Sequence, residues 1–468
     1  MYSFLLSIVA LFLGYFIYGK FVEKVFGINQ EKATPANEQE DGVDYVPMDW
    51  KKIFLIQFLN IAGLGPIFGA ISGALWGPTA FLWIVFGSIF AGGVHDFFSG
   101  MLSIRHKGAS ISEIVGIYLG NGVKQFMRAF SVILLILVGT VFMTGPAGLL
   151  SNLTGISISI WVAIIIAYYF LATILPVDKI IGKIYPLFGA SLIIMAIGIA
   201  GGLLFKGYQV PEITLQNLHP NSLPLWPLLF VTIACGAISG FHATQSPMMA
   251  RCVTNEKYGR RIFYGTMLAE GVIALIWAAA AMTFFGGTEG LLAAGTPAVV
   301  VNAISRELMG PIGGFLAMLG VIAAPITSGD TAFRSARLTI ADSINVTQKP
   351  IAKRLLLAAP LFVIAYGLTL IDFTIIWRYF AWSNQTLAMI VLWTSAAYLA
   401  VNNKLHWIAT IPATFMTAVS VTYILQAPEG LKLATSISYP IGISVALALL
   451  VGFLMVGKKL PDKAQISA

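Results

Sequence analysis

Residues 58–66 read Phe58-Leu-Asn-Ile-Ala-Gly-Leu-Gly-Pro66, and they interrupt an apolar segment long enough to cross a membrane. Proline removes a backbone donor and glycine weakens a helix, so helical hydrogen bonding is expected to fail here. A second stretch, Phe230-Val-Thr-Ile-Ala-Cys-Gly-Ala-Ile-Ser-Gly240-Phe-His-Ala-Thr-Gln-Ser-Pro247, repeats the Ile-Ala step followed by glycines. The sequence therefore predicts two helices that are broken inside the membrane.

The composition around these stretches is that of a membrane protein. Of 468 residues, 58% are hydrophobic and only 10% are charged, whereas soluble domains carry about 25% charged residues. Apolar runs of about 20 residues, the length that a bilayer requires, recur along the chain. We predict an all-α polytopic protein with about 13 transmembrane helices. The expected spans are 1–19, 53–76, 80–103, 130–149, 156–175, 185–205, 225–248, 262–285, 312–327, 355–371, 374–400, 407–425 and 439–456.

The distribution of basic residues tests this topology. With thirteen spans, 24 of the 28 Lys and Arg fall on one side. This bias follows the positive-inside rule and predicts an outside N-terminus and a cytoplasmic C-terminus in a prokaryotic cytoplasmic membrane. The net charge of +8 is then a property of topology and does not indicate a nucleic-acid partner. The four on the other side are Lys206, Arg306, Lys432 and, at a span edge, Arg378.

Two short helices are expected between spans. Ser110 and Glu113 have capping-box spacing before the apolar run 114–119 on the inner side. In the outer loop, Thr296 and Pro297 have the residue types of a helix start for a helix over 297–308.

The positions of the two broken spans point to transport. Five spans separate their starts, so a second five-span copy must be inverted relative to the first. Interrupted helices at matching places in inverted halves are typical of a transporter site near the midplane, where half-helix N-termini face an anionic group and freed carbonyls face a cation. The alternative is that the glycines only allow close helix packing.

Ionisable residues at membrane depth usually face a cavity or a partner. Asp96 and Glu270 lie inside spans, and Asp330 lies near an inner end. His95, next to Asp96, is a candidate proton site or a packing histidine. His242, beside the second break, is a candidate substrate contact. Glu270 is a candidate gate residue or a simple hydrogen-bonding partner of a neighbouring helix.

Two further polar clusters are candidates. Asp330 and Arg334 share a helix face and form either a structural ion pair or a gate. Thr327 and Ser328 precede them with two hydroxyls suited to a hard cation. Asn384 and Gln385 follow an aromatic cluster that is either an interfacial belt or part of the pathway.

Several chemistries are not indicated by the sequence. It contains no Walker A loop, His-Glu-x-x-His pattern or nucleophile elbow. Cys235 and Cys252 form neither a disulfide framework nor a metal spacing. We therefore expect no enzyme activity and no cofactor, and a small-molecule substrate and membrane lipid as the partners, with the oligomeric state left open.

Four strings carry a family resemblance. The stretches 59–67, Gly93-Val-His-Asp-Phe-Phe-Ser-Gly100, 239–247 and Thr327-Ser-Gly-Asp-Thr-Ala-Phe-Arg-Ser-Ala-Arg337 resemble the carbon starvation protein A (CstA) family over residues 1–404, as a short member. The resemblance implies uptake of peptides, and in some members pyruvate, under nutrient limitation.

The chain also resembles the amino acid–polyamine–organocation superfamily, which implies a LeuT-like core of five plus five inverted helices with discontinuous first and sixth members. That core would divide the chain at 1–52 (first helix and linker), 53–222 and 223–402 (the two repeats) and 403–468 (two helices and a cytoplasmic tail). It also implies a cation site at the Ala62 and Gly63 carbonyls facing Thr327 and Ser328.

The resulting hypothesis is a secondary importer of small carboxylate nutrients coupled to H⁺ or Na⁺. A channel, a membrane-embedded enzyme and a nutrient sensor remain as alternatives. The substrate-binding candidates are Asn60, Gly63, Gly65, Gly236, Gly240, His242, Gln245, Asn384 and Gln385. The coupling candidates are Ala62, Thr327, Ser328, His95, Asp96 and Asp330, and the gate or ion-pair candidates are Arg334 and Glu270. No metal is expected beyond a coupling Na⁺.

Overall fold

The computed structural model describes the chain except residues 43, 175–177, 345, 347, 349 and 457–468. The tail predicted at 457–468 and the end of the fifth span at residue 175 lie outside the described residues. The described part is all-helical, with only an isolated bridge between Met48 and Val253. The helices are α1 (Tyr2–Leu13), α2 (Gly19–Phe26), α3 (Pro35–Glu38), α4 (Trp50–Ile61), α5 (Ala70–Gly73), α6 (Thr79–Phe86), α7 (Gly93–Arg105), α8 (Ile111–Leu119), α9 (Asn121–Thr154), α10 (Ile158–Ile174), α11 (Asp178–Phe205), α12 (Leu228–Thr232), α13 (Gly240–Ala250), α14 (Gly265–Phe284), α15 (Thr288–Ala294), α16 (Pro297–Ala317), α17 (Ala324–Ser343), α18 (Ile351–Thr369), α19 (Phe373–Val401), α20 (Trp407–Gln426) and α21 (Thr435–Val456). Wider π-helical turns join several of them: η1 (Gly14–Tyr18), η2 (Gly65–Gly69), η4 (Gly87–Gly92), η6 (Arg260–Tyr264) and η7 (Met318–Ala323).

The number of membrane spans agrees in part with the prediction of thirteen. Within the described residues, nine helical segments are long and apolar enough to cross a membrane, and two bent pairs bring the total to eleven. The other two expected spans correspond to α10, which has 17 residues, and to the broken pair α12 and α13. The count of thirteen therefore stays a prediction.

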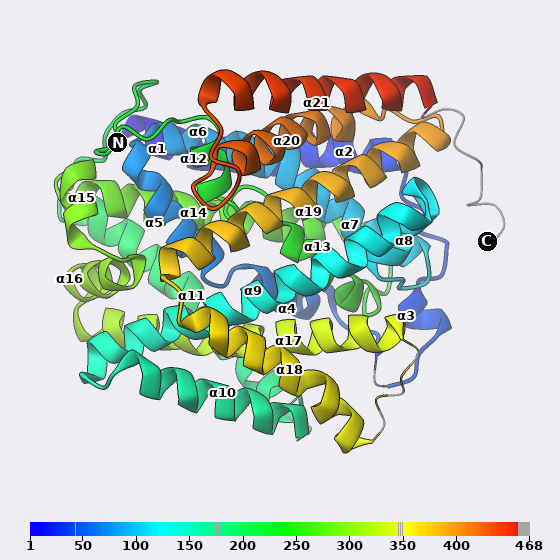
Figure 1. The fold of residues 1–468 in the computed structure, drawn as a ribbon, viewed down its shortest axis with the longest axis horizontal. Helices are drawn as coiled ribbons and strands as arrows, with labels where there is room; N and C mark the ends of the chain where they lie inside the picture. Colours follow the sequence, from blue (N-terminus) through cyan, green and yellow to red (C-terminus); the bar gives the residue numbers. More distant parts are fainter. Residues whose placement is uncertain (43, 175–177, 345, 347, 349, 457–468) are drawn as a thin grey trace.

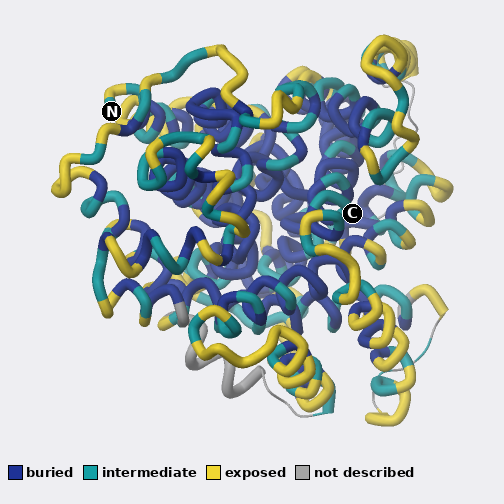
Figure 2. The backbone as a smooth tube through the Cα atoms, turned by 60° about the vertical axis from the view of Figure 1, so that its left-hand side comes forward, coloured by how far each residue is buried: buried dark blue, intermediate teal, exposed yellow. Residues whose placement is uncertain are grey.

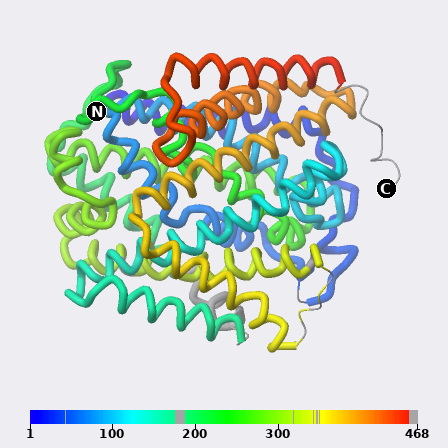
Figure 3. Tube along the Cα trace, in the orientation of Figure 1, coloured from blue at the N-terminus to red at the C-terminus, as the bar shows by residue number. Residues whose placement is uncertain are grey.

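The long helices run roughly along one axis of the molecule, alternating in direction (Figure 1). The path traced in Figure 3 begins at one end of this bundle, and α21 finishes at the opposite end. This placement is what an odd number of crossings requires.

Burial separates an inner set of helices from an outer set (Figure 2). In α19, 89% of the most apolar stretch is buried, whereas in α21 the share is 11%. Helices α7, α13 and α14 are mostly buried like α19, whereas α10 and α18, like α21, have few buried residues. The inner set surrounds both helix breaks.

The two short helices form where they were expected. The Ser110 hydroxyl accepts a hydrogen bond from the Glu113 backbone N–H at 3.4 Å, and α8 follows. The outer-loop helix α16 begins at Pro297. Gly310, with φ of 63°, then kinks the chain so that the same segment turns into the membrane.

One boundary prediction is wrong. The span expected to end at residue 327 continues through η7 and α17 to Ser343. Asp330 and Arg334 therefore lie inside a helix and not near its end. The sequence misled because α17 is polar along much of its length, and a polar helix packed against α9 is not recognised by hydropathy.

Candidate functional site

The first predicted break is confirmed. Helix α4 ends at Ile61, and Ala62 leaves the helical conformation with φ of −81° and ψ of 46°. The chain resumes helical structure at Gly65, and the two halves are bent by 53°. The peptide groups of Ala62 and Gly63 thus lie outside regular helix in the middle of the span.

The second break is also confirmed, and it is longer. Helix α12 ends at Thr232, and Ile233 has φ of −92° and ψ of 77°. Ser239 is extended, with φ of −146° and ψ of 127°, and α13 begins at Gly240. Gly236 therefore lies within the break, whereas Gly240 opens the helix that follows it.

The two broken segments pack directly against each other. A Cβ on Gly65 would lie 2.3 Å from the Cβ of Cys235, and a Cβ on Gly73 would lie 2.2 Å from the Ile233 side chain. The glycines of the first segment are thus required for close contact with the second break. Close packing and helix interruption, two alternatives at the sequence level, occur together.

Side chains on neighbouring helices form hydrogen bonds with backbone groups that the second break leaves without helical partners. The Trp83 indole N–H donates to the Ile233 carbonyl at 3.0 Å, and the Ser88 hydroxyl donates to the Gly236 carbonyl at 3.1 Å. The Asn384 side-chain oxygen accepts from the Ser239 hydroxyl at 2.7 Å and from the Phe241 N–H at 3.0 Å. Asn384, on α19, therefore caps the N-terminus of α13.

Four ionisable side chains meet beside this break, all with no solvent exposure: His95, Asp96, His242 and Glu270, called here the His–acid cluster. The Nδ1 atoms of His95 and His242 lie 2.7 Å and 2.9 Å from the two oxygens of the Asp96 carboxylate. Asp96 on α7 is thus held from one side by its neighbour and from the other by α13.

His242 also connects the cluster to α14. Its Nε2 lies 3.4 Å from Oε2 of Glu270, longer than an ordinary hydrogen bond. Within the described part of the chain, neither Glu270 oxygen has a hydrogen-bond partner. The imidazole of His242 therefore stands between two buried carboxyls, hydrogen-bonded to Asp96 and close to Glu270.

Other predicted substrate residues are buried nearby. The Gln385 amide donates to the Phe230 carbonyl at 2.8 Å, and the Gln245 amide donates to the Thr244 hydroxyl at 2.9 Å. Asn60 is 6% exposed in the last turn of α4. These three side chains come from both broken segments and from α19.

Four of the predicted coupling and gate residues, Thr327, Ser328, Asp330 and Arg334, lie on α17. The hydroxyls of Thr327 and Ser328 both donate to the Ala324 carbonyl, at 2.7 Å and 3.1 Å, which leaves their oxygen lone pairs available. Asp330 and Arg334 form the expected pair at 3.3 Å. Within the residues that the structure describes, no group of three or more His, Cys, Asp or Glu side chains is arranged to hold a metal ion.

Sequence reasoning missed Trp83 and Ser88 as partners of the break. Both lie on an ordinary apolar span, and neither has a neighbouring polar residue that would mark it. Only the packing of α6 and η4 against residues 233–236 gives them this role.

The sequence profile of the family described as "Carbon starvation protein CstA" matches residues 1–152 and 146–288. The chain belongs to the CstA family. A membrane protein of Haemophilus influenzae is 47% identical over 62% of this chain and 92% of its own length. The peptide transporter CstA of Campylobacter jejuni is 26% identical over 92% of this chain and 81% of its own. The pyruvate/proton symporter BtsT of Escherichia coli is 28% identical over 58% of this chain and 47% of its own.

Solved structures place this CstA-family chain in the LeuT-like fold class. Mhp1, a nucleobase-cation-symport-1 family transporter, superimposes with a TM-score of 0.54 at 13% identity, covering 89% of this chain and 96% of Mhp1. A mutant manganese transporter of Eremococcus coleocola gives 0.52 at 14% identity with the same coverage. The solved structures show the fold alone, whereas the family and its relatives named as transporters make the chain a multi-pass membrane transporter and not an enzyme.

Proposed function

We propose that this CstA-family transporter imports small carboxylate nutrients, peptides or pyruvate-like acids, and is driven by protons. The observation that carries the proposal is the His–acid cluster at the second helix break. It joins the break to two neighbouring helices through groups whose contacts depend on protonation.

Charge balance makes the cluster a proton site. With Asp96 ionised, Glu270 neutral and both imidazoles neutral, the four groups carry one negative charge. One added proton makes the cluster neutral, and a buried cluster is least costly to desolvate when its net charge is zero. Both imidazoles contact the Asp96 carboxylate, so a proton that enters the cluster can be held between an imidazole and Asp96.

The substrate carboxylate is assigned to the N-terminus of α13. Half-helix N-termini at a transporter midplane bind anionic groups, and the helix dipole favours them there. The Asn384 oxygen now accepts the hydrogen bond at that place, and a carboxylate oxygen would replace it. Peptides and pyruvate share this carboxylate, and Asn60, Gln245 and Gln385 supply further polar contacts.

Coupling then follows from the position of His242. It lies two residues after the first residue of α13, so the same helix end meets the substrate and the proton. Protonation of the cluster strengthens the ties from α13 to Asp96 and Glu270. Release of the proton weakens those ties and frees the half-helix to move during alternating access.

Sodium is the competing coupling ion. Thr327 and Ser328, with carbonyls at Ala62 and Gly63, would form its site, as the resemblance to the amino acid–polyamine–organocation superfamily implies. The relative BtsT is named as a pyruvate/proton symporter. Because the His–acid cluster also offers a buried proton acceptor, we favour H⁺ as the coupling ion.

Reconstituted uptake tests the proposal. Proteoliposomes containing the full chain are given labelled pyruvate or labelled dipeptides, with either a proton gradient or a sodium gradient imposed alone. We expect saturable accumulation of one substrate class under the proton gradient. A lack of accumulation under every gradient would remove the transporter assignment for these substrates, and accumulation under sodium alone would move the coupling site to α17.

A further inference from the structure

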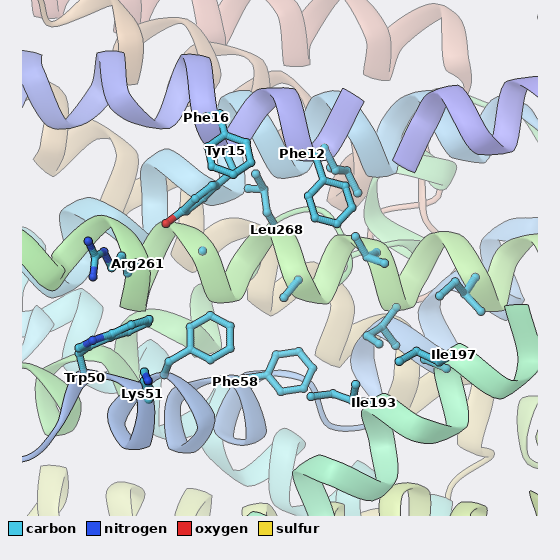
Figure 4. A pocket seen from close by; sticks show the side chains of 18 residues that line it. Phe12, Tyr15, Phe16, Trp50, Lys51, Phe58, Ile193, Ile197, Arg261 and Leu268 are labelled. Carbon is cyan, nitrogen blue, oxygen red and sulfur yellow. The ribbon is translucent and has the colours of Figure 1, made fainter. Parts of the chain in front are cut away.

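A groove lies beside α4, the first half of the first broken helix, and none of the four His–acid cluster side chains lines it (Figure 4). Its walls are α1 with η1, α4, α11 and α14, and its volume is about 690 Å³. Phe12 and Phe16 lie on one side and Phe58 and Ile193 on the other, as Figure 4 shows, and Ala269 also lines the groove. A cavity of this size fits the range of small-molecule sites.

The groove is open to the membrane. Phe12, Phe16 and Ile197 are 56%, 54% and 65% exposed, so their apolar surface faces lipid. Along most of its length the groove therefore offers hydrocarbon contacts to a chain-shaped apolar molecule.

One end of the groove is basic. Lys51 and Arg261 line it there, beside Trp50, as Figure 4 shows. The Arg261 guanidinium lies 5.0 Å from the Trp50 ring and 5.8 Å from the Tyr258 ring, which orients it. Among the residues that the structure describes, no carboxylate pairs with either cation, in contrast to the adjacent Arg260, which pairs with Glu23 at 3.0 Å. Two cations are thus available to an anion from the membrane.

We propose that this groove binds an anionic phospholipid, with one acyl chain along the apolar walls and the phosphate between Lys51 and Arg261. Basic pockets between transmembrane helices bind anionic headgroups, and an aromatic ring at the interface supports such a site. The apolar walls match the acyl chain of a phospholipid, and the basic end matches its phosphate. A small anion would occupy only the basic end, and a purely apolar ligand only the apolar walls.

The site has a structural consequence for transport. Trp50 and Phe58 belong to α4, the first half of the first broken helix, and Ala269 immediately precedes Glu270 on α14. A bound lipid therefore contacts both a moving half-helix and the helix that carries one member of the His–acid cluster. Occupancy of the groove is expected to hold α4 against α14 and to alter the uptake rate.

Native mass spectrometry of the purified full chain tests the binding itself, independently of any transported substrate. The probes are palmitoyl-oleoyl phosphatidylglycerol and phosphatidylcholine with the same acyl chains. The double substitution Lys51→Gln and Arg261→Gln removes the charges and keeps most of the side-chain length. We expect it to weaken phosphatidylglycerol retention roughly 30-fold, about fivefold for each charge.

A matched control removes two neighbouring charges. Lys52 and Lys257 are exposed and do not line the groove, so Lys52→Gln with Lys257→Gln lowers the net charge equally and should leave retention unchanged. Ala269→Phe, which fills the apolar part, should release the lipid while both cations remain. Together these variants separate a site from general attraction to an anionic membrane.

Three results would overturn the proposal. They are equal retention of phosphatidylglycerol by the charge-loss variant and its control, equal retention of phosphatidylcholine and phosphatidylglycerol by the wild type, and a dimer that Ala269→Phe dissociates. The last result would assign the groove to a second copy of the chain.

Discussion

His242 makes the most consequential single contacts in the molecule. Its ring lies 2.9 Å from Asp96 and 3.4 Å from Glu270 and carries no solvent exposure. The sequence marked all four members of the His–acid cluster as functional candidates. Asp96 and Glu270 were selected as acids at membrane depth, and the two histidines for their positions beside Asp96 and beside the second break. The sequence analysis gave these residues separate roles in substrate binding, proton transfer and gating. Their contact could not be predicted, because distances along the chain do not show that α7, α13 and α14 pack side by side.

Replacement of His242 should separate its two contributions. We expect His242→Ala to abolish uptake, a loss of more than about tenfold, because two buried carboxyls lose the group between them. His242→Gln keeps a hydrogen-bonding side chain without a titratable group, and should retain the fold while losing proton-driven accumulation.

Membrane expression, thermal stability and uptake of each variant are the measurements. His219→Ala is the control, because that imidazole lies in the loop before α12. Wild-type kinetics in His242→Ala would refute the role assigned to this residue.

Among the elements, the first broken helix depends on contact with the second break. Gly65→Ala would place a methyl group 2.3 Å and 2.4 Å from the Cβ and Sγ of Cys235. Overpacking of this kind costs about 1–3 kcal/mol. We expect Gly65→Ala to lower the thermal midpoint and uptake together.

A second-site change provides a test of this explanation. Cys235→Gly removes both atoms that clash, at a position already outside regular helix, so the double variant should recover stability and transport. If Cys235→Gly fails to improve Gly65→Ala, the close approach of the two segments is not the reason for the glycine.

The interfacial helix α8 is anchored to α9 by an ion-pair cluster. Glu113 lies 2.5 Å from both Lys124 and Arg128. Partial burial alone would raise the pKa of Glu113, but the two cations outweigh it and hold the pKa below the usual 4.5. A depressed carboxylate pKa stabilises the folded state above the unfolded-state pKa, and this contribution is lost as pH falls through the folded-state value.

Glu113→Gln should therefore lower stability at neutral pH and have no effect in strong acid. The side chain is 41% exposed, so we expect a loss of about 1 kcal/mol or less. Thermal unfolding in detergent at pH 7 and near pH 3 measures the difference. A deficit that persists unchanged in acid would show that the ion pairs are not its source.

The elements differ in how far their sequences predict them. Glycine and proline mark both breaks because they act on the local backbone, and Ser110 marks the start of α8 for the same reason. Hydropathy failed at α17, whose polar residues pack against protein and not lipid. The pairing of Glu113 with Lys124 and Arg128 could not be predicted in this way, because only the turn into α9 brings these side chains close.

At the scale of the whole molecule, composition and the positions of Lys and Arg predict a helical bundle with its ends on opposite sides. The described residues form a helical bundle, and its likeness to Mhp1 gives the LeuT-like class. The side of the membrane that each end faces stays a prediction. The division into repeats at residues 222 and 223 stays a prediction. The packing of the two broken segments beside the His–acid cluster is a property of the assembled bundle, since it joins residues 65, 96, 235, 242 and 270 from four separate segments.

Proton movement with the substrate is the most direct measurement of this account. Proteoliposomes enclosing a pH-sensitive dye in sodium-free buffer receive external pyruvate or dipeptide, with protein-free liposomes as the reference. The wild type should acidify the lumen, whereas Asp96→Asn should not, although it still exchanges labelled substrate in counterflow. Equal acidification by Asp96→Asn and the wild type would contradict the assignment of the proton to the His–acid cluster.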